Sequence, residues 1–427
     1  MRRYYELSGD TLDWAPATTA APHLPLLTLD ELQKAVHVVQ PNGQSVHGAE
    51  AMFTIMDRIG LRRWPLALYR HVPPFHWACD LFYRSVANHR GIANQLSSML
   101  FGKVELPSTF LLTRRVFLRL MGMILLAAFI SIGTQLPSLF GDQELLPAAH
   151  LVQHATDDTV HWWRMADLQL LPLNLTETRM QALVLIGALG SGMMTIGFFP
   201  IWSAIMAWLA YLIIFIFGGV SFQQPWDALL LEVGLLAVLW SPGSWRLNSL
   251  EAKRPSRLVY WLILLLLGKL IFFGSLFKLQ TGDSIDSDSA ALTNYLWMQP
   301  LPLCTAWYAD ALPAVVSKLA CVLMFIIGLV APVLLLFPRV PRAIGASLIM
   351  LLMIGILATG NYGFFNWLII VLCLTMFDDA LLLKLWPQTA RGTIRVGIRP
   401  PTGPLLGWIR NCLALLVLAL GIISISM

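Results

Sequence analysis

Residues 258–278 read LVYWLILLLLGKLIFFGSLFK, a run in which Lys269 and Lys278 are the only charged side chains. A helix that crosses the hydrocarbon core of a bilayer needs about 20 mostly apolar residues. The stretch therefore predicts a transmembrane helix. Eight further runs of this kind bring the total to about nine such helices in an all-α polytopic membrane protein: 116–136, 180–199, 201–219, 226–242, 314–337, 343–358, 362–383 and 406–426.

The composition supports a membrane protein. Of 427 residues, 57% are hydrophobic and only 12% are charged, whereas soluble domains carry about a quarter charged residues. The net charge of +5 could suggest a nucleic-acid partner. However, the basic residues form short clusters between apolar runs, which is the distribution that the positive-inside rule produces. We therefore expect the lipid bilayer as a partner and no nucleic acid.

The loops also predict an orientation. Nine spans place every basic cluster on one side of the membrane, whereas loops 137–178 and 279–313 are acidic. Because basic loops stay in the cytoplasm, we expect a cytoplasmic N-terminus and an external C-terminus. The basic clusters lie within 84–115, 246–257, 339–342 and 384–399.

Residues 1–110 have the composition of a soluble domain and precede the membrane domain, residues 111–427. Thr28 with Glu31 three residues later predicts a capped helix start. Residues 36–39 read as a strand, and residues 49–59 read as a helix. We therefore expect a partial α/β domain. The opening residues have no apolar signal-peptide core, so the first span is expected to act as an uncleaved signal anchor.

Neither a metal nor a cofactor is predicted. None of the cysteines forms a CxxC pair, and no Cys/His group has the spacing of metal ligands. His150, His154 and His161 share one loop, but an amphipathic segment on the membrane explains them better. The cysteines are Cys79, Cys304, Cys321, Cys373 and Cys412.

Five motifs that follow one another along the chain carry a resemblance to a known family. They read QLPSLFGDQELLPA at 135–148, SFQQPWDALLLEVG at 221–234, FGSLFKLQTGD at 273–283, QPLPLCTAWY at 299–308 and TGNYGFFN at 359–366. Together they resemble the lipase maturation factor family. The resemblance singles out Gln135, Pro137, Gly141, Pro147, Trp226, Gly274, Ser275, Gly282, Asp283, Pro300, Pro302, Trp307, Tyr308, Asn361, Tyr362, Gly363 and Asn366.

The segment 24–90 resembles the C-terminal part of a DCC-type thiol–disulfide oxidoreductase domain. Its D-x-x-C-x-x-C motif should lie upstream and does not occur in this sequence. Members of the lipase maturation factor family continue past the last span into a soluble domain, whereas this sequence stops at Met427. The chain therefore resembles a truncated member of the family, and the sequence alone leaves open whether either end is truncated. The fused oxidoreductase remnant favours a bacterial inner membrane.

Four charges lie inside or at the ends of predicted spans, where ionisable side chains are costly and mark candidate functional sites. Asp227 and Glu232 open the fourth span, and Lys269 and Lys278 lie on the fifth. With a rise of about 1.5 Å per residue, Glu232 and Lys269 lie at similar depths below the outer membrane surface. Asp227 and Lys278 both lie near that surface. These four residues can thus form structural ion pairs. The alternative is a catalytic base, because the segment around Lys278 is similar to the one that bears the base lysine of vitamin K-dependent carboxylase.

Three functions follow from these resemblances. The first is a membrane-embedded maturation factor or chaperone that assists the folding of exported proteins such as lipases. The second is a membrane enzyme that acts on a lipid or quinone-like substrate with Lys278 as its base. The third is an inert scaffold that has lost both terminal parts. The sequence alone leaves open whether the protein is an enzyme.

Overall fold

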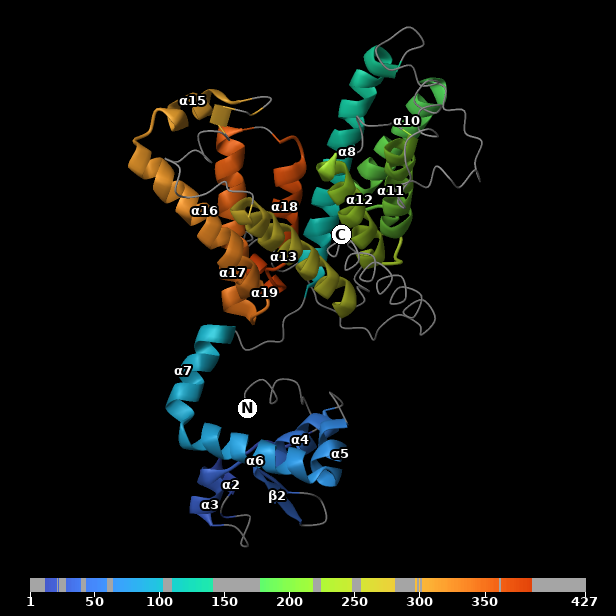
Figure 1. Cartoon of the computed structure of the whole chain (residues 1–427). Coiled ribbons are helices and arrows are strands. Elements are labelled where there is room, and N and C mark those ends of the chain that lie inside the picture. The colour runs from blue at the N-terminus through green and yellow to red at the C-terminus, as the bar shows by residue number, and fades with distance from the viewer. Residues whose placement is uncertain are drawn as a thin grey trace. The chain divides into compact units, whose positions relative to one another are not determined.

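A computed structural model of the chain describes residues 12–20, 22, 28–39, 44–59, 64–102, 110–140, 177–217, 224–247, 255–280, 296–297, 299, 302–360 and 362–385. The chain divides into two compact units, Met1–Pro107 and Ser108–Met427 (Figure 1).

The first unit is a small α/β assembly. Its two strands, β1 (His37–Val39) and β2 (Ser45–His47), pair antiparallel with Val38 opposite Val46. Its helices are α2 (Ala17–Ala20), α3 (Leu29–Lys34), α4 (Gly48–Arg58), α5 (Trp64–His71), α6 (Pro73–Asn88) and α7 (Arg90–Phe101). The strand expected at 36–39 and the helix expected at 49–59 are both present.

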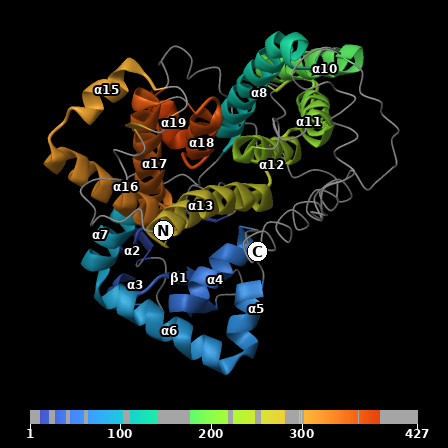
Figure 2. The same ribbon diagram turned by 45° about the horizontal axis from the view of Figure 1, so that its top comes forward.

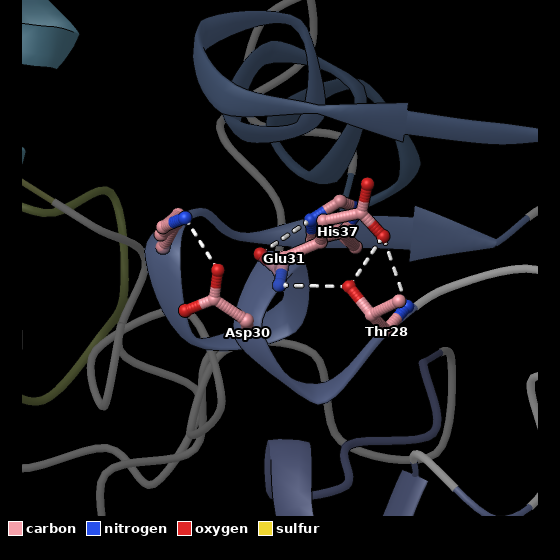
Figure 3. A network of polar contacts seen from close by, with 5 residues as sticks. Thr28, Asp30, Glu31 and His37 are labelled. Carbon is pink, nitrogen blue, oxygen red and sulfur yellow. Dashed lines mark hydrogen bonds and ion pairs between the residues drawn. The ribbon is translucent and has the colours of Figure 1, made fainter.

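The capping box predicted at Thr28 is confirmed (Figure 3). The Glu31 carboxylate accepts hydrogen bonds from the Thr28 backbone N–H at 2.9 Å and from the Thr28 hydroxyl at 2.7 Å. The Glu31 N–H donates back to Thr28 Oγ1 at 3.4 Å. These bonds lower the pKa of Glu31, the backbone bond from Thr28 contributing most. His37 then bonds the Glu31 carbonyl at 3.1 Å, which ties the start of β1 to α3.

Long-range bonds attach the later helices of this unit to its strands. The Val36 N–H donates to the Tyr83 hydroxyl at 2.9 Å, and Arg90 donates to the Lys34 carbonyl at 2.6 Å. Tyr83 and Arg90 both lie in the segment that resembles the oxidoreductase domain. They therefore hold α6 and α7 against the α3–β1 connection.

The second unit is a helix bundle. Figures 1 and 2 both show α8, α10, α11 and α12 gathered together, with α13 leading across to α16, α17, α18 and α19. The bounds are α8 (Leu111–Phe140), α10 (Glu177–Ile196), α11 (Pro200–Phe217), α12 (Pro225–Trp240), α13 (Arg257–Gln280), α15 (Cys304–Asp310), α16 (Ala314–Leu335), α17 (Arg339–Thr359), α18 (Phe365–Leu374) and α19 (Asp379–Leu385).

Five of the described helices are long and apolar enough to cross a membrane: Leu111–Leu136, Thr178–Ile196, Arg257–Gln280, Ala314–Leu335 and Arg339–Thr359. Pro200–Ile216 and Phe365–Leu374 are apolar but shorter. Helix α12 covers the run predicted at 226–242, and the run at 406–426 lies outside the described residues. The structure is thus that of a membrane protein.

One predicted span needs correction. The run 362–383 is not a single helix, because α18 ends at Leu374 and α19 begins at Asp379. The break is polar. The Thr375 hydroxyl donates to the Leu372 carbonyl at 2.6 Å, and Asp378 Oδ1 accepts from the Leu381 N–H at 3.1 Å, which starts a new helix.

The division expected at Pro200 is present and has a clear cause. Gly197 (φ 89°) and Phe199 (φ 42°) both adopt positive φ, which ends α10. Pro200 then opens α11, where its missing N–H costs nothing. The Phe199 N–H donates to the Trp245 carbonyl at 2.8 Å, so the turn is held against the segment that follows α12.

Small residues let the helices approach closely, as membrane helices require. A Cβ on Gly187 of α10 would overlap the buried Phe129 ring of α8. A Cβ on Gly345 of α17 would lie 2.7 Å from the Ala331 carbonyl oxygen of α16. Ser275 of α13, one of the family-motif residues, similarly fills the space above Gly328 of α16.

Gly187→Ala should therefore lower the thermal stability of the protein in detergent, by the roughly 1–3 kcal/mol typical of overpacking. Gly192→Ala is the matched control on the same helix, because a Cβ there meets no atom within 4 Å. It should leave the melting temperature unchanged or raise it. Equal melting temperatures for the two variants would contradict the close α8–α10 contact.

Candidate functional site at the ends of the helix bundle

Asp227 opens α12 and is almost fully buried. The Tyr211 hydroxyl of α11 donates to Asp227 Oδ1 at 2.6 Å. The Gln224 N–H donates to Asp227 Oδ2 at 3.3 Å. A carboxylate at a helix N-terminus is also stabilised by the helix dipole. Asp227 thus has a local hydrogen-bonding role that joins α11 to α12.

The other three charges of the predicted cluster lie differently. Lys269 is close enough to Glu232 to act on it electrostatically. Among the residues that the structure describes, no ion pair within 4.0 Å joins Glu232 to Lys269 or Asp227 to Lys278. Lys278 lies in the last turn of α13 and is exposed. Lys269 therefore acts on Glu232 only through its charge, beyond ion-pair distance, and Asp227 has other partners.

Two motif segments that are distant in sequence lie side by side. Pro302 forms an antiparallel bridge with Gly360, and the Thr305 hydroxyl donates to the Ala358 carbonyl. This contact fixes the α15 segment, residues 302–310, to the end of α17. Motif residues Trp307 and Tyr308 of this segment are 78% and 73% exposed.

Buried amides accompany these segments. Both side-chain amide atoms of Gln299 are buried and have no hydrogen-bond partner among the described residues. The same holds for Nδ2 of Asn366, at the start of α18. Such groups are costly to leave unsatisfied and call for an explanation. Asn366 is the last residue of the motif at 359–366, and Gln299 is the first residue of the motif at 299–308. Their burial was not predicted.

The remaining motif residues are spread over the unit. Gln135 lies on the exposed side of α8, where its amide donates to the Ser131 hydroxyl at 3.1 Å. Trp226 is partly exposed, and a Cβ on Gly274 would meet no atom within 4 Å. Gly363 has φ 55°, as expected for a tight turn beside Tyr362. Pro137 lies in α8. Gly141, Pro147, Gly282, Asp283, Pro300 and Asn361 lie outside the described residues.

A second polar group, which sequence reasoning missed, lies where α8 and α17 begin. We call it the arginine–aspartate centre. Asp378 is completely buried and forms an ion pair with the buried Arg339. Arg342 donates to the Met376 carbonyl at 3.0 Å, and its guanidinium lies over the rings of Phe110 and Tyr260. The centre comprises Arg339, Arg342, Asp378 and Asp379. Arg115 of α8 lies within electrostatic reach of Asp379.

Asp379 caps the first helix of the bundle from the other end of the sequence. Its Oδ2 accepts from the Leu111 N–H at 2.7 Å, and its Oδ1 accepts from the Thr113 N–H at 3.0 Å. The Thr113 hydroxyl donates to Asp379 Oδ1 at 3.0 Å and contacts the Phe377 carbonyl oxygen at 2.9 Å. The adjacent acidic pair at 378–379 was the available signal, because charges within an apolar run are rarely incidental.

Comparison with known proteins decides the family. The sequence profile of the lipase maturation factor transmembrane domain matches residues 112–384. This chain belongs to the lipase maturation factor family. The matched region runs from the start of α8 to the end of α19, so it contains the whole arginine–aspartate centre. A DCC1-like thiol-disulfide oxidoreductase profile matches residues 3–95, in agreement with the second predicted resemblance.

Curated relatives carry the same family name. Lipase maturation factor 2 of Gallus gallus is 32% identical over 321 residues, which cover 72% of this chain and 44% of that protein. Lipase maturation factor 2 of Homo sapiens is 32% identical over 63% of this chain and 40% of its own length. For lipase maturation factor 1 of Mus musculus the identity is 29%, over 66% of this chain and 51% of that protein. No solved structure matches.

The matches with this lipase maturation factor homologue thus cover 40–51% of the length of these relatives. The family profile itself covers the membrane domain, residues 112–384. The activity of the whole relatives therefore does not transfer with the alignment alone.

The Arg339–Asp378 pair should show the behaviour of a buried ion pair. Arg339→Met strands a buried carboxylate and should cost about 3–5 kcal/mol of stability, whereas adding Asp378→Asn should recover part of that loss. Thermal unfolding in detergent measures both variants. Lys34→Met breaks the exposed Lys34–Asp30 pair and should change little. A double variant less stable than either single variant would contradict the pairing.

Proposed function

We propose that this chain is a membrane-embedded maturation factor that assists the folding of exported proteins, lipases among them. Its family membership over residues 112–384 supports a maturation role. The names of the curated relatives supply lipases as the client class. The relatives are roughly twice as long as the aligned region, so client choice is part of the proposal.

The observation that carries the proposal is the α15 segment. Its Trp307 and Tyr308 side chains are largely exposed, yet its backbone is fixed by the Pro302–Gly360 bridge and the Thr305–Ala358 bond. Rigidly presented aromatic side chains provide large contact areas at a low entropy cost. An apolar client segment that has not yet folded can bind such a surface without a shaped pocket.

The proposed topology places the N-terminus in the cytoplasm and the α15 segment outside. Bonds and ring contacts bring the starts of α8, α13 and α17 to one end of the bundle, where Arg115, Arg257 and Arg342 lie. Gathered basic residues support a cytoplasmic position for this end. The fused DCC1-like domain favours a bacterial inner membrane, whereas the three relatives named above are vertebrate proteins.

A membrane enzyme with Lys278 as base is the alternative. A base lysine needs a desolvated site that lowers its pKa, whereas Lys278 is exposed in the last turn of α13. This exposure favours a structural role at the headgroup layer. Long lysine side chains at helix ends commonly reach the interface in this way.

Trp307→Ala with Tyr308→Ala should reduce the yield of active exported lipase several-fold in cells that depend on this protein, while its membrane level is unchanged. Trp202→Ala on α11 is the matched control, because Trp202 is 68% exposed but lies outside the α15 segment. Lipase activity per amount of secreted lipase measures the effect. Full maturation by the double variant would refute the role of the α15 segment.

Lys278→Met provides the second arm of that experiment. The maturation proposal expects near-normal yields from this variant. Abolished maturation by a stable, correctly inserted Lys278→Met protein would instead favour the enzyme.

The native cysteines test the topology. Cys304 is exposed at the start of the α15 segment, whereas Cys321 and Cys373 are buried. A membrane-impermeant maleimide added to intact cells should label Cys304, and Cys304→Ser should remove that label. Cys79 in the first unit should react only after lysis. Its reaction should also be slow, because burial raises the pKa of its thiol. Cys304 labelling only after lysis would invert the proposed orientation.

A further inference from the structure

Helix α7 adds nothing to the core of the first unit. None of its 12 residues is buried, whereas α4 buries Ala49, Ala51 and Ile55. An isolated helix of this length is marginal in water, because most helical stability in proteins comes from packing an apolar face. Helix α7 therefore needs a surface to pack on, and the described part of the first unit does not provide one.

The apolar face of α7 is well defined. Ile92, Leu96 and Met99 are spaced by four and three residues, so they lie on one side of the helix. Their side chains are 66%, 55% and 71% exposed. The opposite side is polar except for Phe101 at its end, and it carries Asn94, Ser97 and Ser98. A contiguous exposed apolar face of this kind marks an interaction site.

The chain keeps this face beside the bilayer. Gly102, with φ 72°, ends α7, and α8 begins at Leu111, where a helix able to cross a membrane starts. The nine connecting residues 102–110 reach at most about 35 Å, even if they are fully extended. A short tether gives a local concentration on the order of millimolar. Even a weak affinity for the membrane surface therefore keeps the helix docked.

The charge around α7 matches an anionic membrane. Residues 81–104 include Arg84, Arg90 and Lys103 and contain no acidic side chain. Anionic phospholipids attract basic residues that lie next to the bilayer. A helix with an apolar face and basic surroundings is typical of segments that lie in the membrane–water interface. The same positive charge disfavours pairing of α7 with the α7 of a second copy.

We propose that α7 lies in the membrane–water interface and inserts Ile92, Leu96 and Met99 into an anionic leaflet. The apolar face of such helices enters the boundary between headgroups and acyl chains by about 5–10 Å. Because Arg90 of α7 bonds the Lys34 carbonyl, the docked helix also anchors the DCC1-like unit at the membrane. The proposal is independent of the maturation role.

The test uses the full chain in vesicles of phosphatidylglycerol and phosphatidylcholine, with one cysteine-linked fluorophore in a background that lacks other reactive cysteines. Met99→Cys places the label on the apolar face, and Ser97→Cys is the matched control on the polar face. Nitroxides on the lipid acyl chains should quench the label at position 99 several-fold more than the label at 97. Aqueous iodide should show the opposite preference.

The other occupants of this face give different results. If the label at position 99 is quenched by iodide as strongly as the label at 97, the face is in water and the proposal fails. If position 99 is protected from both quenchers, a protein surface covers the face, which also overturns the proposal. A loss of that protection on dilution into more lipid would identify the surface as a second copy.

Charge variants locate the face. With the label at position 99, Leu96→Glu should lower acyl-chain quenching several-fold, because a carboxylate cannot enter the leaflet. Ser97→Glu adds the same charge to the polar side of the same helix and should keep most of the quenching. Neither residue is buried, so both variants should fold, which circular dichroism checks. Equal losses from the two variants would refute the face.

Lipid composition tests the anionic preference. Quenching at position 99 should fall several-fold in vesicles of pure phosphatidylcholine, since the basic residues then lose their attraction to the surface. High salt should have a similar effect in the mixed vesicles, because it screens exposed charges. Quenching that is equal in both kinds of vesicle would overturn the anionic leaflet as the partner.

Discussion

The bundle depends on a carboxylate that caps a helix from a distant part of the chain. Asp379 satisfies the Leu111 and Thr113 N–H groups at the start of α8. A helix N-terminus in or near a bilayer has few other partners for these groups, and each one left unsatisfied costs several kcal/mol. The cap therefore fixes the start of the first described span against the start of α19, and both lie in the family-defining region.

The adjacent carboxylate of Asp378 extends this anchor to α17 through Arg339. Helices α16 and α17 then run from this end to the opposite one, where Gly360 holds the α15 segment. The polar anchor at one end thus determines where the exposed aromatic side chains are presented at the other.

The sequence predicted the helices far better than their contacts. Apolar runs are local, so most of the expected spans coincide with described helices, and the Thr28–Glu31 capping box is equally local. Depth along the axis was a weaker guide. It placed Asp227 level with Lys278. However, depth says nothing about how a helix is rotated about its own axis, which decides which neighbour a side chain faces. Asp227 accepts a hydrogen bond from Tyr211 instead. The arginine–aspartate centre joins residues up to 268 positions apart, which no pattern within one span can reveal.

The cap also sets an order of events during synthesis. Thr113 and Asp379 are 266 residues apart. At translation rates of about 5–20 residues per second, the start of α8 exists for roughly 13–50 s before the carboxylate that completes it has been made. During that interval its N–H groups depend on water and headgroups at the membrane surface. The bundle is therefore closed by its last described helices rather than built up from its first, and any chain released before Asp379 remains an open arrangement of inserted helices.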